Sequence, residues 1–340
     1  MKSIILKKIP FYYTIGLFVI TIAVTLFLTL SFNNNKDTLS QRNTSSTSCA
    51  STVKRMEGYQ FIKPILFTDE DCPSERLNDV KAAIQDIITN YSKFQNVTAA
   101  SVYVRDYEYN DWTAVNEAVQ YEPGSLFKVP VLIAYLRMNE EKPGSLDKEL
   151  TYLKPFAINK DVAFTAKSIQ IGKKYKIREL LKYMIEYSDN NATALLFTSL
   201  DVTILKKLFS DLGLEEPVVN AQQYFFNVQQ YSLFMRALYN ASYLNRDDSE
   251  FAAELLSKSE FNEGIVKGLP KNTKLIHKFG ESGNPQEIQL HESAIIYLNN
   301  KCYLLTIMTK GKDNKVLSKL IAEITASVHN AVASPTVTSL

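Results

Sequence analysis

Cysteine, histidine and tryptophan are scarce in this 340-residue chain, which contains three, three and one of them. The cysteines form no CxxC pair, and no Cys/His array has the spacing of metal ligands. The sequence therefore predicts neither a structural metal nor a cofactor. Cys49 and Cys72 could pair outside the cytoplasm, whereas Cys302 lies beside an apolar run and is expected to be a buried small hydrophobe.

A strong imbalance of charge is also missing. The 38 basic and 36 acidic residues leave a formal charge of +2, and neither sign forms a dense run. Nucleic-acid binders carry a basic patch or stripe, so this balance argues against a nucleic-acid partner. Internal repeats are absent as well. With 46% hydrophobic residues, the chain can bury a substantial core, which excludes disorder throughout.

One long segment near the N-terminus, residues 11–32, carries no charged side chain. A helix of that length crosses the hydrocarbon core of a bilayer, so we predict a single transmembrane anchor there. Lys2, Lys7 and Lys8 precede it, and positive flanks stay in the cytoplasm. Residues 1–10 are then a cytoplasmic tail, and the chain after residue 32 lies outside the cell membrane. A cleaved signal peptide is the alternative, but no small-residue cleavage site follows Phe32.

The rest of the chain divides by composition. The sequence from Asn33 to about Val53 turns to Asn, Ser and Thr without hydrophobic periodicity, so residues 33–57 are predicted to be an extracytoplasmic linker. A folded domain is expected over residues 58–332, followed by a short tail at 333–340.

Hydrophobic spacing inside the domain predicts its helices and strands. Helices are expected over 77–91, 125–139, 177–185, 202–212, 228–239, 250–256 and 313–332. Strands are expected over 99–105, 274–280, 288–298 and 302–309, with the last two joined as a hairpin at Asn299-Asn300. This order predicts an α+β fold: a mostly antiparallel sheet flanked by the terminal helices, with an all-α subdomain inserted in the middle.

The residues with chemical potential begin at Pro123-Gly124-Ser125-Leu126-Phe127-Lys128, where a loop enters a predicted helix. Ser125 and Lys128 are one turn apart, so their side chains can touch. Backbone N–H groups at a helix start can stabilise an oxyanion, and a desolvated lysine can accept the serine proton near neutral pH. Ser125 is thus the candidate nucleophile and Lys128 its candidate base, with a glutamate that acts through a water as the alternative base. The SxxK pattern alone is weak, because Ser51 to Lys54 matches it within the polar linker.

Two further motifs support the copy at Ser125. In Ser188-Asp189-Asn190, a polar turn after a predicted helix can aim Ser188 as a proton relay and Asn190 toward a substrate amide. Lys278-Phe279-Gly280 lies on a predicted strand. There Lys278 would attract a carboxylate, and Gly280 would let a substrate backbone lie against the strand edge.

In this order, the three motifs resemble the SxxK, SDN and KTG set of class A β-lactamases and penicillin-binding proteins. The resemblance covers about residues 60 to 330. It implies a β-lactamase/transpeptidase-like fold and a serine that is acylated by a β-lactam or a peptidoglycan stem peptide. It also implies an oxyanion hole formed by the backbone N–H groups of Ser125 and Glu281. The expected protein is a membrane-anchored serine hydrolase or acyl-enzyme.

The sequence departs from the family pattern at two places. Phe279 replaces the hydroxyl residue of KTG, so recognition of a substrate carboxylate is expected to be weaker or to serve a different substrate. The segment from Glu216 to Asn220 echoes the family loop whose glutamate activates the deacylating water, but it follows Ser188 at a short distance. Glu216 is therefore a candidate base, with an exposed turn as the alternative. Without a positioned base, the acyl-enzyme would persist.

A binding function is the alternative to an enzyme. Ser188 and Asn190 are residue types that cap helices, and Lys278 has the character of a solvated edge-strand lysine. On that interpretation, the chain would be a membrane-tethered module that recognises cell wall or a partner protein.

Overall fold

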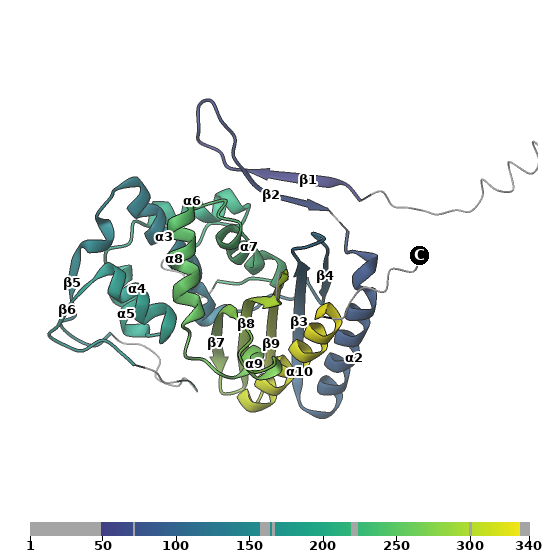
Figure 1. Ribbon diagram of the computed structural model, residues 1–340. Helices are drawn as coiled ribbons and strands as arrows, with labels where there is room; N and C mark the ends of the chain where they lie inside the picture. The colour runs from purple at the N-terminus through teal and green to yellow at the C-terminus, as the bar shows by residue number, and fades with distance from the viewer. Residues whose placement is uncertain are drawn as a thin grey trace, which may run out of the picture. The chain divides into compact units, whose positions relative to one another are not determined.

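A five-stranded antiparallel sheet forms the centre of the fold (Figure 1). Its strands stand in the order β4-β3-β9-β8-β7. They are β3 (Val97–Asp106), β4 (Trp112–Val115), β7 (Leu275–Asn284), β8 (Glu287–Leu298) and β9 (Lys301–Gly311). The first and last parts of the domain meet in this sheet, because β3 pairs with β9. The computed structural model describes residues 49–70, 72–156, 164, 167–218, 224–298 and 301–333.

The two terminal helices cover one face of the sheet. They are α2 (Asn78–Phe94) and α10 (Asn314–Ala333), which contact each other and strands β3, β8 and β9. In α10 the buried residues Leu317, Leu320, Ile321 and Ile324 recur at helical spacing, so one stripe of the helix faces the sheet. The predicted flanking of the sheet by terminal helices is confirmed.

An inserted helical region lies between β4 and β7 in the chain. Its helices are α3 (Lys128–Glu141), α4 (Ile177–Glu186), α5 (Asn190–Phe197), α6 (Val202–Leu212), α7 (Val228–Tyr239), α8 (Arg246–Ser257) and α9 (Gly264–Gly268). The described residues also form three 3₁₀ turns, η1 (Glu75–Leu77), η2 (Gly124–Phe127) and η3 (Ser145–Asp147), and a small ribbon of β5 (Glu149–Thr151) and β6 (Lys174–Lys176). Helix α7 contacts β3, β8 and β9, and α8 contacts β7, which brings this region onto the sheet. The expected α+β architecture is confirmed.

The hairpin between β8 and β9 is also confirmed. Leu298 pairs with Lys301, so two residues connect the strands at the predicted Asn299-Asn300 position. Those two residues themselves lie outside the described part of the chain.

Residues 51–70 form a further hairpin that the sequence did not predict. Strand β1 (Ser51–Arg55) pairs antiparallel with β2 (Ile65–Glu70), and Met56, Leu66 and Phe67 are buried. The linker prediction for 33–57 is therefore wrong from residue 51 onward, and the domain begins before residue 58. The polar composition misled because β1 exposes most of its side chains while β2 supplies the buried face. The copy of SxxK at Ser51 lies on this strand and not on a helix.

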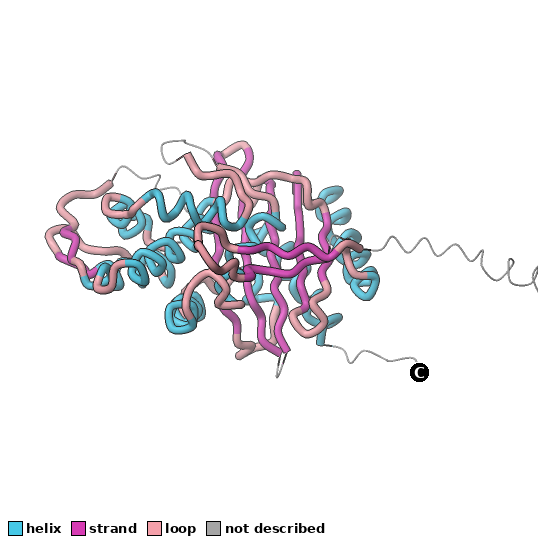
Figure 2. Tube along the Cα trace, turned by 90° about the horizontal axis from the view of Figure 1, so that it is seen from above, coloured by secondary structure: helices cyan, strands magenta, loops and turns pink. Residues whose placement is uncertain are grey.

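Asp69 of β2 fastens this hairpin to the rest of the domain. It forms ion pairs with Arg236 of α7 and Arg105 of β3, whose guanidinium groups are buried. Arg236 also lies over the ring of Phe67 at 4.6 Å. Seen from above in Figure 2, the β1–β2 ribbon runs across the direction of the central strands. The hairpin is thus an integrated part of the fold.

The predicted membrane anchor at 11–32 and the cytoplasmic tail at 1–10 lie outside the described residues, as does the chain after residue 333. Within the part that the structure describes, no helix has the length and apolar character needed to cross a bilayer. Cys49 and Cys72 are disulfide-bonded, and Cys302 is free and buried as expected.

Candidate active site

The nucleophile candidate Ser125 lies in a short 3₁₀ turn that leads directly into α3. We call residues 123–127 the serine turn. A 3₁₀ helix has three residues per turn, so the side chains of Ser125 and Lys128 stack along one edge of it. The sequence-based expectation that these two residues share a face is consistent with this geometry. Ser125 is partly exposed, while Lys128 is only 4% exposed.

Two glycines seat the serine turn against the edge strand β7. A Cβ atom on Gly280 would lie 2.2 Å from the Pro123 carbonyl oxygen, and one on Gly124 would lie 2.2 Å from the Glu281 carbonyl oxygen. Only glycine allows two main chains to approach so closely. The space on the face of β7 beside Gly280 is therefore filled by the serine turn, while the expected approach of a substrate backbone along the strand edge stays a prediction. The same contact puts the main chain of Glu281 next to Gly124.

Three side chains of β7 and β8 hold the residue just before the serine turn, Glu122. Its carbonyl oxygen accepts hydrogen bonds from His291 Nε2 at 2.9 Å and Ser282 Oγ at 2.8 Å, and its N–H donates to Gln289 Oε1 at 3.1 Å. His291 Nδ1 accepts from the Thr309 N–H, so its proton is on Nε2. Burial lowers the pKa of His291 to about 3, which keeps the ring neutral. The sheet therefore fixes the entry to the serine turn.

The Lys128 ammonium nitrogen is the hub of a polar cluster. It donates to the Ser188 carbonyl oxygen at 2.5 Å, to Ser188 Oγ at 3.0 Å and to Asn190 Oδ1 at 2.7 Å. Among the described residues, no hydrogen bond joins it to Ser125. Burial lowers the pKa of Lys128 to about 7, although the charge of Asp189 opposes that shift. An amine with this pKa is half neutral at pH 7 and can accept a proton.

The turn that carries Ser188 and Asn190 is held in place by the residue between them. Asp189 caps α5 by accepting the N–H of Asn191, and it also accepts from Ser168 Oγ and the Ile169 N–H. Ser188 has a left-handed φ of 52°, which is uncommon for a residue with a side chain. The interpretation of Ser188 and Asn190 as simple helix caps is therefore wrong. Asp189 does the capping, and its neighbours contact Lys128.

Lys278 reaches the same cluster from β7. Its Nζ donates to Ser188 Oγ at 2.9 Å and to the Phe279 carbonyl oxygen at 3.2 Å. The side chain is fully buried, and burial with the nearby charge of Lys128 holds its pKa well below the usual range. Lys278 is thus not the solvated edge-strand lysine of the alternative interpretation. A substrate carboxylate has no open path to a fully buried Nζ, so the expected direct contact is not supported either.

Phe279 closes the space above that lysine. Its ring centroid lies 4.1 Å from Lys278 Nζ, a distance suited to a cation–π contact. The ring stacks on Phe261 at 4.1 Å and meets Phe164 edge-on at 5.0 Å. Phe279 is itself only 4% exposed. An aromatic cluster therefore occupies the position where the family motif carries a hydroxyl.

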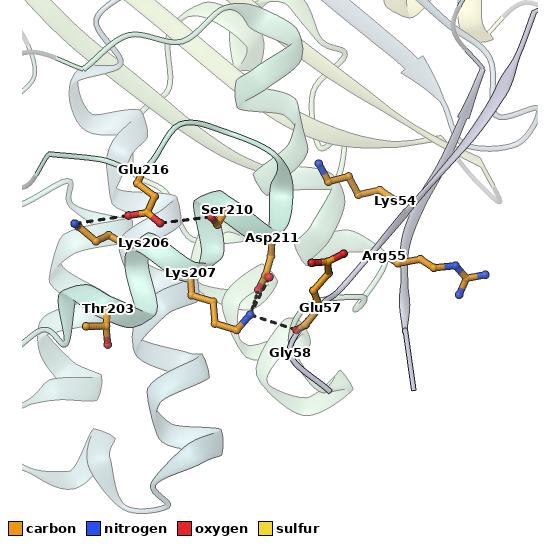
Figure 3. Close-up of a pocket in the computed structure, with 10 residues that line it drawn as sticks. All are labelled: Lys54, Arg55, Glu57, Gly58, Thr203, Lys206, Lys207, Ser210, Asp211 and Glu216. Carbon is orange, nitrogen blue, oxygen red and sulfur yellow. Dashed lines mark hydrogen bonds and ion pairs between the residues drawn. The ribbon is translucent and has the colours of Figure 1, made fainter. Parts of the chain in front are cut away.

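Glu216 does not join this cluster. Its carboxylate pairs with Lys206 at 3.6 Å and accepts from Ser210 Oγ at 3.5 Å (Figure 3). These residues line a cavity of 680 Å³ between α6 and the β1–β2 hairpin, whose lining includes neither Ser125 nor Lys128. The contacts of Glu216 match the alternative of an exposed turn after α6. Its role as a deacylating base remains a sequence-based prediction that these contacts do not favour.

The residues that support the cluster are not among the predicted site residues. Asp189 is the middle residue of the Ser188-Asp189-Asn190 motif, and the signal that could have found it is an acidic residue just before a helix, which is typical of a cap. Phe261 and Phe164 gave no signal in the sequence, because only folding brings them to Phe279. Within the described part of the chain, no group of three or more His, Cys, Asp or Glu side chains could hold a metal ion.

Solved structures of known proteins share this fold. PBP-A is 20% identical with a TM-score of 0.64, covering 77% of this chain and 98% of its own. A β-lactamase from Chitinophaga pinensis is 19% identical with a TM-score of 0.65, covering 75% of this chain and 100% of its own. A class A β-lactamase from Mycobacterium abscessus is 19% identical with a TM-score of 0.61, covering 74% and 100%. At these identities the likeness defines the class of fold, that of β-lactamases and PBP-A.

The family itself follows from a match over most of the chain. The model of the Beta-lactamase enzyme family matches residues 79–332. The chain therefore belongs to this family, as its three motifs suggested, and to the general class of serine-hydrolase-type enzymes. No curated protein matches the chain.

Proposed function

We propose that this protein is a serine acyl-enzyme in which Ser125 is acylated by a β-lactam or a peptidoglycan stem peptide. One observation carries the proposal. Lys128, Asn190 and Lys278 converge on the Ser188 turn, with hydrogen bonds of 2.5 to 3.0 Å that involve both lysine nitrogens. Such a hydrogen-bonded cluster of two amines, a hydroxyl and an amide, one turn from a candidate nucleophile, suits proton transfer.

The cluster supports a specific sequence of proton movements. Neutral Lys128 takes the proton of Ser125 as Oγ bonds to the carbonyl carbon, and the carbonyl oxygen becomes an oxyanion. Backbone N–H groups of Ser125 and Glu281 would stabilise that oxyanion. Ser188 then passes the proton from Lys128 to the leaving nitrogen as the C–N bond breaks. Lys278 holds Ser188 Oγ in position for this relay.

Release of the acyl group is expected to be slow. Hydrolysis needs a base that activates water, and the carboxylate of Glu216 is engaged by Lys206 away from the cluster. The protein would then behave as a penicillin-binding protein that keeps its adduct. A solved structure of a PBP-A variant is an acyl-enzyme complex with penicillin G, which is a precedent within the same fold.

The substrate is expected to depend little on a carboxylate at the β7 edge. Phe279 offers no hydroxyl, and its ring shields Lys278, which is fully buried. Both groups that would bind such a carboxylate in the family motif are therefore absent or covered. Replacing Phe279 by threonine should uncover this position, and tighter binding of penicillin by that variant would support the account.

We place the domain outside the cell membrane, anchored by the predicted helix at 11–32. The disulfide-bonded state of Cys49 and Cys72 fits an oxidising compartment. Peptidoglycan stem peptides would be reached from that side.

Intact-mass analysis of the full-length protein after incubation with a fluorescent penicillin tests the acylation proposal. Wild type should gain one covalent adduct, and Ser125→Ala should gain none. Ser51→Ala is a matched control, because Ser51 begins the other SxxK copy, on strand β1. An adduct that survives in Ser125→Ala would contradict the assignment of the nucleophile. Loss of the adduct over hours in wild type, but not in Glu216→Gln, would restore Glu216 as a base.

A binding module without acylation is the second candidate. It is favoured by the shielding of Lys278 and by the lack, among described residues, of a hydrogen bond between Ser125 and Lys128. Absence of any adduct on wild type, together with retained binding of purified peptidoglycan, would select this function.

A further inference from the structure

The β1–β2 hairpin exposes an unusual group of apolar side chains. Among the described residues, eleven large hydrophobic side chains are exposed, and five of them belong to this one hairpin. We call these five the hairpin patch: Val53 at 49%, Tyr59 at 40%, Phe61 at 88%, Ile62 at 59% and Ile65 at 49% exposed. So many exposed apolar side chains within 13 consecutive residues, Val53 to Ile65, are more than ordinary scatter and point to an interaction site.

The hairpin holds the patch in a fixed place. Leu66 and Phe67 of β2 are buried, as is Met56 just after β1, so the hairpin is packed against the domain mainly through β2. The loop between the strands is also tied down, because Arg137 of α3 donates to the Tyr59 hydroxyl at 3.1 Å and Lys207 of α6 donates to the Glu57 carbonyl oxygen at 3.4 Å. The exposed side chains therefore have a defined orientation relative to the active site.

Positive charge accompanies the patch. Between Val53 and Ile65 the hairpin carries the cations Lys54, Arg55 and Lys63 but only one carboxylate, Glu57. In Figure 3, Lys206 and Lys207 at the adjacent cavity are paired with carboxylates, whereas Lys54 and Arg55 reach no carboxylate of the drawn set. Lys54 Nζ lies beside Gly213 at the end of α6, so the exposed cations near the tip are Arg55 and Lys63. An apolar tip with these two cations beside it matches the surface of a membrane that contains anionic lipids.

The position of the hairpin in the chain also favours a membrane surface as the binding partner. The predicted anchor ends at residue 32, and strand β1 begins at Ser51. A random-coil chain of the same length spans roughly 25 Å on average, so a predicted anchor at 11–32 would bring the hairpin within reach of the bilayer. Basic and apolar groups held at that distance meet the membrane at a high effective concentration.

We infer that the hairpin patch inserts into the surface of the anionic bilayer to which the chain is anchored, with Phe61 and Ile62 leading. The side chains of Arg55 and Lys63 then contact lipid phosphates. This docking fixes the orientation of the Ser125 site relative to the membrane. Without it, the linker alone would leave that orientation unrestricted. The inference rests on the proposed anchor but not on acylation at Ser125.

Tryptophan quenching by brominated lipids measures the insertion directly. The full-length chain is reconstituted into vesicles of phosphatidylglycerol and phosphatidylcholine, with acyl chains brominated at defined depths. The probe is Phe61→Trp, and Phe94→Trp is its matched control, because Phe94 is 75% exposed at the end of α2. The single native tryptophan, Trp112, is common to both variants and supplies the baseline.

The inference predicts a blue-shifted, severalfold more quenched signal for Phe61→Trp than for Phe94→Trp. Adding Arg55→Gln and Lys63→Gln should reduce that quenching in anionic vesicles. Equal quenching of both probes, or none of either, overturns the inference. A blue shift without quenching by bromolipid also overturns it, since a second copy or another protein would then cover the patch.

Flotation of the same vesicles reports separately on the anchor. A chain that floats while Phe61→Trp remains unquenched keeps its anchor but has no docked hairpin. Labelling with fluorescent penicillin in each variant reports on the proposed function, which should not change.

Discussion

Raising the pH from 6 to 8 is expected to speed the acylation of Ser125 about tenfold, because Lys128 must be neutral to accept the serine proton. Burial lowers the pKa of Lys128 to about 7. The neutral fraction is then about one tenth at pH 6, about half at pH 7 and about nine tenths at pH 8. The acylation rate constant should follow that fraction and level off above pH 8.

Stopped incubations with fluorescent penicillin, read by gel fluorescence and intact mass, give the rate constant at each pH. Lys128→Arg keeps a positive charge of similar reach but does not release its proton in this range. It should therefore lose about 10²-fold or more in rate at every pH. Lys54→Arg, in the other SxxK copy, is the matched control and should behave as wild type.

Three results would refute this reasoning. A rate that is flat between pH 6 and 8 in wild type would mean that Lys128 is not the titrating base. Full activity of Lys128→Arg would mean that the amine takes no proton at all. A fall in rate as the pH rises would instead indicate that a protonated group is required.

Three further predictions concern the structure around the site. Burial lowers the pKa of His291 from an ordinary 6.5 to about 3 in the folded protein, so the unfolded chain binds a proton first as the pH falls. The free energy of unfolding should therefore drop by about 1.4 kcal/mol between pH 7.5 and 5.5. In urea titrations, His291→Gln should lack that part of the loss. Asp69→Asn leaves Arg105 and Arg236 buried with a neutral partner, and should cost about 3 kcal/mol by thermal or urea unfolding; an unchanged midpoint would show that water already compensates these charges. Gly280→Ala must displace the serine turn, and a shift of about 1 Å should slow penicillin acylation about 10²-fold, whereas an unaltered rate would contradict the seating of the turn on β7.

Much of the fold could be predicted because each element carries its own periodic signal. The apolar positions of α4 recur at helical spacing, and all of Ile177, Leu180, Leu181, Met184 and Ile185 are buried. The run around Asn299-Asn300 gave the β8–β9 connection for the same local reason. Strand β1 could not be predicted because its exposed polar residues look like those of a linker. The contacts that place the hairpin, the pairing of β1 with β2 and the ion pairs of Asp69 in β2, are not visible in the local sequence.

The candidate site divides along the same line. The residue types at 125, 128, 188, 190 and 278, and their order, came from the sequence, since a family motif is a local pattern. The burial of these residues could not be predicted from the sequence. Burial lowers the pKa of Lys128 and shields Lys278 from solvent. The letters at Glu216 resemble a catalytic loop, yet the side chain pairs with Lys206, a choice made by the packing of α6 and the segment after it.

What the sequence determined alone is therefore the family, the α+β order of elements and the set of reactive side chains, because all three are encoded in local spacing. Tertiary structure decided which of those side chains meet, which are shielded from water and where the hairpin projects. Those properties depend on contacts between residues far apart in the chain, and on the low dielectric environment that such contacts create.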